Sequence, residues 1–187
     1  RKILQNSFLD RNSLVLDIGC NTGFTTLEIA RTVKCQVIGI DPVQEAIDTA
    51  MLQLNSDTNE IKKLVSFQKG SALELDFSNN TFDLVVTGGA TSFIDEKQKA
   101  INEYYRVMKP WGFLSVTNLC YLTDPPEKLI NDISSLIGVK INPWSATDWL
   151  NLFSKQEKFE IYNLEEYKLY DREQSVIENY VDLFMGK

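Results

Sequence analysis

A stretch of sixteen residues near the start of the chain, VLDIGCNTGFTTLEIA at residues 15–30, constrains the fold more than any other part of the sequence. An apolar run ends at Asp17, five residues bounded by Gly19 and Gly23 follow, and a helical pattern then begins. Glycine allows the backbone to approach a ligand closely, and a helix N-terminus favours an anionic group. The stretch therefore predicts a strand, a turn that holds a small molecule, and a helix.

Strand-like and helix-like segments alternate through the first two thirds of the chain. Strands are expected at residues 14–18, 36–40, 64–68, 82–87 and 113–118. Helices are expected at residues 24–33, 44–54 and 95–108, with Asp95 as the N-cap of the third, a loop or frayed helix end at 55–60 and a turn-rich connection at 71–80. This alternation predicts an α/β fold, Rossmann-like and doubly wound, with a mostly parallel sheet and helices on both faces.

The regular alternation of strands and helices ends after the fifth expected strand. A helix is expected from Asp124, as its N-cap, to Ile137, and a capping-box pattern at Ser145 predicts another helix start. Residues 159–169 are strand-like and residues 174–184 are helical in pattern. We interpret residues 1–187 as one domain in which residues 119–158 form lid helices beside the ligand.

Composition excludes several classes of function. The net charge is −7 and the pI is near 4.7, which opposes nonspecific binding to nucleic acid. Three isolated cysteines predict neither a disulfide framework nor a zinc site, and they favour a cytoplasmic location. No apolar run approaches the roughly 20 residues of a membrane span. The sequence contains no histidine, so a catalytic triad and histidine metal ligands are both excluded.

The turn at residues 19–23 does not match the common phosphate-binding motifs. A P-loop needs Gly-Lys followed by Ser or Thr, and the chain has Gly23 followed by Phe24. The dinucleotide pattern GxGxxG fails at Asn21 and Phe24, so a nicotinamide cofactor remains a weak alternative. Asp41 ends the second expected strand, at a distance from Gly19 that suits an acid binding ribose hydroxyls. S-adenosylmethionine fits because it carries a ribose and a carboxylate but no phosphate.

Several motifs in one order resemble the class I SAM-dependent methyltransferases, and the small-molecule branch called type 11 in particular. They are DIGCNTG at 17–23, Asp41, GSA at 70–72, FDLVVT at 82–87 and RVMKPWG at 106–112. The resemblance covers residues 12–118. It implies the strand order 3-2-1-4-5-7-6 with an antiparallel last strand.

The resemblance also implies which residues bind the cofactor. The turn at 19–23 would pass under the methionine part with Asp17 near its amino group, Asp41 would bind the ribose, and the 70–72 turn would face adenine. The full implied set is Asp17, Gly19, Cys20, Asn21, Thr22, Gly23, Asp41, Pro42, Ser71, Ala72, Thr87 and Gly88. Three positions depart from the family pattern. Asn21 and Trp111 replace common glycines, and Ser71 replaces an aspartate that accepts from the adenine amino group.

The implied reaction is methyl transfer from S-adenosylmethionine to a small-molecule acceptor, with S-adenosylhomocysteine as product. Contacts with the acceptor are expected from residues near the ends of the fourth and fifth strands, namely Thr91, Ser92, Tyr121 and Trp144. Neither the acceptor nor a catalytic base is assigned by the sequence. The alternatives are a SAM-binding protein without transferase activity and a nicotinamide-dependent oxidoreductase.

Two other features resemble motifs of related enzymes but fit them poorly. Cys120 follows the fifth strand, as the nucleophile of RNA cytosine-5 methyltransferases does, but the flanking motif is missing. Asp124-Pro125-Pro126 resembles an amino-methyltransferase motif that belongs after the fourth strand instead. Because the chain starts with Arg1 and no strand-like run follows residue 169, we expect the natural protein to extend further and the sheet to have six strands or fewer.

Overall fold

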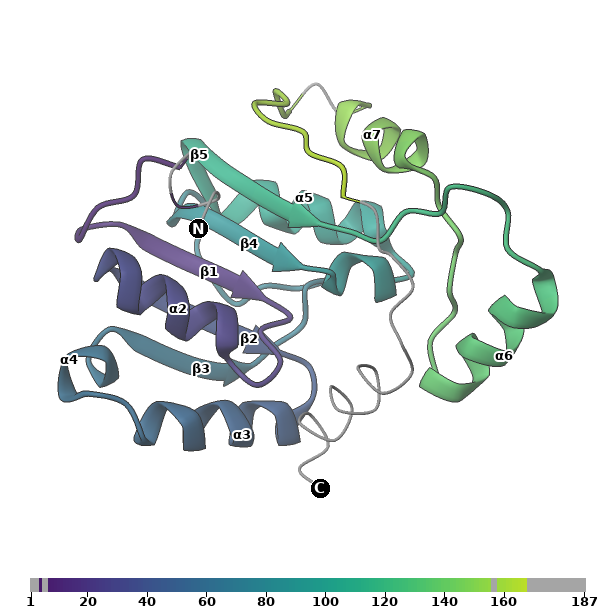
Figure 1. The fold of residues 1–187 in the computed structure, drawn as a ribbon. Coiled ribbons are helices and arrows are strands. Elements are labelled where there is room, and N and C mark those ends of the chain that lie inside the picture. Colours follow the sequence, from purple (N-terminus) through teal and green to yellow (C-terminus); the bar gives the residue numbers. More distant parts are fainter. Residues whose placement is uncertain (1–3, 5–6, 156–157, 168–187) are drawn as a thin grey trace.

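The computed structural model describes residues 4, 7–155 and 158–167 of the chain. Within these residues five strands form one sheet in the order β3-β2-β1-β4-β5, and every neighbouring pair is parallel (Figure 1). The strands are β1 (Leu14–Ile18), β2 (Gln36–Asp41), β3 (Val65–Lys69), β4 (Phe82–Gly88) and β5 (Met108–Thr117). The first five positions of the implied strand order, the doubly wound architecture and the parallel pairing are therefore confirmed.

Helices follow the strands in the expected alternation. They are α2 (Phe24–Val33), α3 (Gln44–Asn55), α4 (Asn59–Lys62), the 3₁₀ helix η1 (Ala90–Phe93), α5 (Lys97–Val107), α6 (Glu127–Ile137) and α7 (Ala146–Ser154). No helix in the described part of the chain has the length and hydropathy of a membrane-crossing segment.

The two faces of the sheet bury separate apolar clusters, because successive strand side chains point to opposite faces. Val15 of β1 packs with Leu27 of α2 and with the residues of α3 and α4 on one face. Leu16 of β1 packs with Ile101 and Tyr104 of α5 on the other. The sheet is thus covered on both faces, so a ligand has to bind beyond the ends of the strands.

The strand order reverses between β1 and β4, and this is the switch point of the sheet. β1 pairs with β2 on one side and with β4 on the other. The chain leads from β1 to β2 on one side of this point, and from β4 to β5 on the other (Figure 1). Ligands in open parallel sheets bind beyond the carboxyl ends of the strands at such a point. The candidate site is therefore formed by the segments that follow β1, β2 and β4.

Several predicted boundaries are wrong for local reasons. The loop or frayed helix end predicted at 55–60 is partly helical, since Asn55 ends α3 and Asn59 begins α4. The N-cap Thr58 of α4 accepts from Ile61 N, and this turn buries Ile61. Helix α5 begins at Lys97 after Glu96, and Asp95 makes no side-chain cap. Helix α6 likewise has Pro126 as N-cap, because Asp124 stands two residues too early. The capping box of Ser145 and Asp148 at α7 is confirmed.

The strand expected at 159–169 does not form in its described part, residues 159–167. Aromatic side chains pack singly there instead: Phe159 lies against Tyr105, and Tyr162 lies against Phe113. Residues 168 and 169 and the helix predicted at 174–184 lie outside the described residues. The described residues contribute five strands, so the predicted limit of six strands is untested where it concerns the remainder.

Strand β5 begins five residues earlier than predicted. Its pairing with β4 shifts register between Phe82 and Leu84, which face Met108 and Phe113 respectively. The extra residues on β5 form a bulge in which Trp111 adopts φ 65° and is 96% exposed. A bulge of this kind leaves residues unpaired, which explains why the 108–112 segment does not show a strand pattern.

Candidate active site

The turn between β1 and α2 has the left-handed backbone that its sequence predicts. Gly19, Asn21 and Gly23 have φ values of 71°, 49° and 88°. Asn21 thus adopts the conformation usually supplied by the glycine it replaces, as asparagine can. A Cβ atom on Gly19 would lie 2.3 Å from Cβ of Ala90, and one on Gly23 would lie 2.6 Å from Cζ of Phe67. At both positions a side chain would be strained by the positive φ and would also clash with a close neighbour.

Four backbone amides of this turn donate to protein atoms. The N–H groups of Gly19 and Cys20 both donate to the Ile40 carbonyl, at 2.9 and 3.0 Å. Gly23 N donates to the Cys20 carbonyl at 2.9 Å. Asn21 N donates to Oδ2 of Asp41 at 2.9 Å. These four amides do not form the row of free donors that a pyrophosphate needs.

Asp41 at the end of β2 joins this strand to the turn. Besides Asn21 N, its carboxylate accepts from Val43 N at 3.0 Å, through Oδ1. The residue is only 8% exposed. Each carboxylate oxygen has a second lone pair, so the group can still accept from a pair of hydroxyls. Pro42, next in sequence, is exposed beside it.

Asp17 near the end of β1 lies beneath the turn and is 2% exposed. Its Oδ2 accepts from the Thr26 hydroxyl of α2 at 2.6 Å. Burial raises the pKa of the Asp17 carboxyl to about 6, against the smaller opposing effect of the Thr26 hydrogen bond, and the charge of Asp41 adds to the rise. Keeping an acid here destabilises the fold at neutral pH, which is typical of a residue retained for ligand binding.

This burial has a measurable consequence for stability. The folded carboxyl holds its proton more tightly than the unfolded one, whose pKa is near 3.8, so the free energy of unfolding should fall as pH rises from about 4 to about 6. The expected loss is on the order of 2–3 kcal/mol. In Asp17→Asn this decline should disappear, and the variant should be more stable than the natural sequence at pH 8. Urea unfolding between pH 4 and 8 measures both.

Comparing the two proteins cancels the titration of the other carboxylates. Asp124→Asn, at an exposed position, is the matched control and should keep the natural pH dependence. An equal decline in the natural sequence and in Asp17→Asn would contradict the assigned burial.

The segment after β4 leaves open space on the ligand side. A Cβ atom on Gly88 or Gly89 would meet nothing within 4 Å. Below this opening the hydroxyls of Thr87 and Thr91 lie 3.1 Å apart, and Thr91 lies 3.3 Å from the Tyr104 hydroxyl. All three residues are fully buried. Thr91 therefore braces the loop from inside, and the expectation that it contacts an acceptor is wrong.

The connection at 71–80, which carries the expected adenine contacts, is held by two side chains of α5, those of Arg106 and Glu103. Arg106 of α5 donates to the carbonyls of Leu75 and Phe77, both at 2.7 Å, and to Glu103. Ser71 at its start is exposed, with Oγ accepting from Leu73 N at 3.2 Å, and Ala72 is half-buried. The exposed Ser71 hydroxyl is accessible to a ligand.

The remaining expected acceptor contacts lie at the ends of β4 and β5. The Ser92 hydroxyl donates to Oδ1 of Asn118 at 3.3 Å. Tyr121 N donates to the Trp144 carbonyl at 2.9 Å, which brings the segment after β5 beside the start of α7. The structure thus places Ser92, Tyr121 and Trp144 near the same strand ends.

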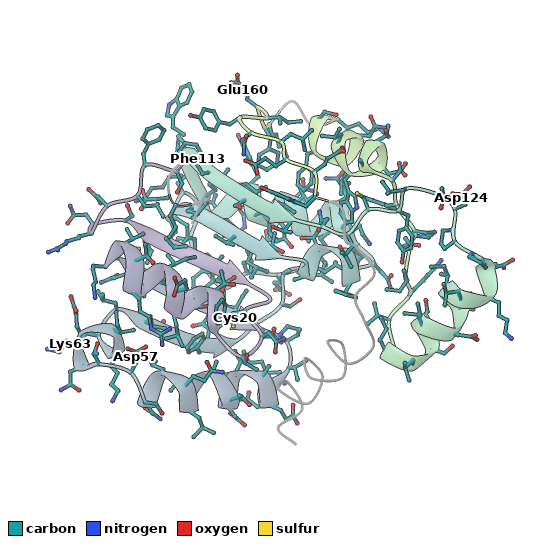
Figure 2. All side chains as sticks on the ribbon, viewed as in Figure 1. Cys20, Asp57, Lys63, Phe113, Asp124 and Glu160 are labelled. Atoms are coloured by element: carbon teal, nitrogen blue, oxygen red, sulfur yellow. The ribbon has the colours of Figure 1, made fainter. Side chains whose placement is uncertain are left out.

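The cysteines at these strand ends do not form a nucleophilic centre. Cys20 lies at the β1–α2 turn, close to the carboxyl ends of the strands (Figure 2). It is buried, and burial raises the pKa of its thiol well above the usual range, so the reactive thiolate is disfavoured. Cys120 is an exposed free thiol. The Cys20 thiol fills space under the turn.

Comparison with known proteins agrees with this geometry. A family model described as a methyltransferase domain, of type 11, matches residues 16–116. This is more than half of the chain. The chain belongs to the class I SAM-dependent methyltransferases. The methyltransferase match ends next to the last residue of β5, so it includes the turn, Asp41 and the loop after β4.

Individual relatives support the same assignment. The chain is 26% identical over 155 residues to an uncharacterized protein of Haemophilus influenzae, covering 82% of this chain and 61% of that protein. It is 31% identical over 138 residues to a demethylmenaquinone methyltransferase of Lactiplantibacillus plantarum, covering 72% and 56%. The chain thus spans less than two thirds of these curated relatives. The crystal structure of MccD protein superposes with a TM-score of 0.82 at 24% identity, covering 98% and 79%, which supports the fold.

Sequence reasoning missed the residues that act through tertiary contact. Thr26 orients Asp17 from the first turn of α2, and Ala90 closes against Gly19. A threonine on the buried face of the helix that follows the turn was a signal for the first. No local feature of the sequence indicates the close approach of Ala90 to Gly19.

Proposed function

We propose that this methyltransferase transfers a methyl group from S-adenosylmethionine to a small-molecule acceptor by in-line displacement. In such a transfer the acceptor atom would form a bond to the methyl carbon, while the carbon–sulfur bond would break and leave its electron pair on sulfur. S-adenosylhomocysteine is the product, and the acceptor loses its proton, if it carries one, to solvent. The proposal rests chiefly on Asp41, which lies beside a turn whose amides donate to protein atoms.

The geometry favours a ribose without a pyrophosphate. The Asp41 carboxylate offers acceptors for vicinal hydroxyls, while four amides of the turn already donate to protein atoms and do not face a pyrophosphate. Asp17 beneath the turn provides a second negative charge for the cationic amino group of the methionine part. When bound, S-adenosylmethionine supplies an activated methyl group on a sulfonium.

The task of the chain's own residues is then to orient the partners and to exclude water. The open space at Gly88 and Gly89 gives the acceptor room beside the β4 end. With no histidine in the sequence, acceptors that need little help from a base suit the site best, such as a thiolate, a carbanion or a neutral amine. The name of the Lactiplantibacillus plantarum relative, a demethylmenaquinone methyltransferase, supports an acceptor of small-molecule size.

Calorimetry with two ligands tests the cofactor. We expect S-adenosylhomocysteine to bind and NAD to give no binding heat, because the turn lacks the dinucleotide glycines and four of its amides already donate to protein atoms. Binding of NAD without binding of S-adenosylhomocysteine would establish the oxidoreductase alternative instead.

A panel of acceptors tests the reaction. The protein is incubated with S-adenosylmethionine labelled on the methyl group and with thiols, amines, phenols and demethylmenaquinone in turn. Transfer of label to one class identifies the acceptor. Binding of S-adenosylhomocysteine without transfer to any class would favour a SAM-binding protein that has no transferase activity.

A further inference from the structure

A buried lysine lies at the acceptor side of the site, outside the residues assigned so far. Lys97 is the first residue of α5 and is 3% exposed. Its Nζ donates to the Ile94 carbonyl, at the end of η1, at 2.6 Å. The same Nζ lies 5.1 Å from the ring centroid of Trp144 and 5.9 Å from that of Trp149. One ammonium group thus contacts the β4–α5 loop and two tryptophans.

The two tryptophans are themselves attached to the segment after β5. Nε1 of Trp149 donates to the Leu119 carbonyl at 3.0 Å, and the Trp144 carbonyl accepts from Tyr121 N at 2.9 Å. The rings pack edge to face, with centroids 4.7 Å apart. The Lys97 ammonium therefore joins three segments: the β4–α5 loop, the residues after β5, and the start of α7.

Burial of this charge needs a reason. No salt bridge joins Lys97 to a carboxylate within the residues that the structure describes. Desolvation lowers the pKa of its ammonium, against the smaller opposing effect of the Asp95 charge. An apolar side chain of similar length would fill the same space without the desolvation penalty. The charge contributes what hydrocarbon cannot, namely a directed hydrogen bond to Ile94 and attraction to two indole faces, which strengthens away from water.

We propose that Lys97 is a positioning residue, and that its ammonium holds the β4–α5 loop and the segment around Trp144 and Trp149 in one arrangement to form the acceptor wall. The link to acceptor binding rests on the proposed function. The link between the three segments rests on the structure alone. Lys97 acts through its neighbours and does not touch the cofactor turn.

Fluorescence tests the link between the segments without any substrate. The sequence holds three tryptophans, and Trp111 is 96% exposed, so Trp111→Phe leaves a background that reports Trp144 and Trp149 alone. On this background Lys97→Met keeps the length of the side chain and removes the charge. We expect acrylamide to quench the two tryptophans about twofold more efficiently in Lys97→Met, because the segment opens more often.

Lys97→Arg is the matched control, because a guanidinium can both donate to Ile94 and stack on an indole. It should restore the quenching of the Trp111→Phe parent. Trp144→Leu on the same background removes one ring and leaves the lysine, and it should raise quenching of Trp149 even if Lys97→Met does not fold. Equal quenching in the parent and in Lys97→Met would show that the ammonium only fills space and would overturn the proposal. If Lys97→Met does not fold, unchanged quenching of Trp149 in Trp144→Leu would overturn it.

A kinetic comparison tests the link to the acceptor. With the acceptor found in the panel, Lys97→Met should lower kcat/KM about tenfold, while the Kd for S-adenosylhomocysteine changes by less than about twofold. Lys97→Arg should recover most of the loss. A parallel loss of cofactor affinity would place the effect in the cofactor site and contradict the assigned role. Failure of the panel would affect the proposed function and leave the fluorescence result standing.

Discussion

Gly19→Ala is expected to lower the free energy of unfolding by about 2–5 kcal/mol. The residue has φ 71°, where an L side chain is strained, and the new Cβ would lie 2.3 Å from Cβ of Ala90. Either the β1–α2 turn or η1 has to move to relieve this contact. Both segments border the proposed cofactor site, so affinity for S-adenosylhomocysteine should fall as well. Urea unfolding and calorimetry measure the two effects.

Gly138 provides a matched control for the strain. It ends α6 with φ 70°, almost the same backbone angle, but a Cβ there would meet nothing within 4 Å. Gly138→Ala should therefore lose only the strain component, about 1–2 kcal/mol, and should keep its affinity for S-adenosylhomocysteine. Equal losses of stability in the two variants would show that the approach of Ala90 to Gly19 is unimportant.

Asp41→Ala is expected to weaken binding of S-adenosylhomocysteine by about 1–3 kcal/mol, roughly 5- to 150-fold. The variant loses the proposed charge-assisted hydrogen bonds to the ribose. It also loses the acceptors of Asn21 N and Val43 N, so the turn is less well ordered before binding. Calorimetry at a temperature well below the unfolding transition separates affinity from stability.

Two further variants distinguish the reasons for this loss. Asp41→Asn keeps one oxygen acceptor and the size of the side chain, and we expect an intermediate affinity. Asp48→Ala removes an exposed carboxylate from α3 and changes the net charge equally, so it should bind normally. Unchanged affinity in Asp41→Ala would refute the role of Asp41 in ribose binding and leave it as a support for the turn.

The elements that sequence reasoning placed well are those encoded within a few residues. The predicted strand at 14–18 and helix at 24–33 coincide with β1 and α2, because hydrophobic periodicity and two glycines define them locally. Asn21 adopts the left-handed conformation expected of it. The capping box at Ser145 was also predicted correctly, since its two partners are three residues apart.

Helix starts without such reciprocal partners were predicted less well. Asp95 and Asp124 are good cap residues by type, yet neither caps a helix, because the two helices start later, with Glu96 and Pro126 at their N-caps. The strand-like pattern at 159–167 failed for a related reason. Its aromatic side chains pack one by one against α5 and β5, and the backbone does not join the sheet.

The sequence by itself determined the doubly wound architecture, the glycine turn and the acid at the end of β2. Each depends on backbone preferences and apolar spacing within a short window. Only the tertiary structure decided that Asp17 is buried against Thr26, that Ala90 closes on Gly19, and that Lys97 lies beneath two tryptophans about fifty residues away. The last two contacts join segments far apart in the chain, and the first joins a strand to the helix that follows it. Their energies come from desolvation and close packing, which exist only after the sheet has brought the segments together.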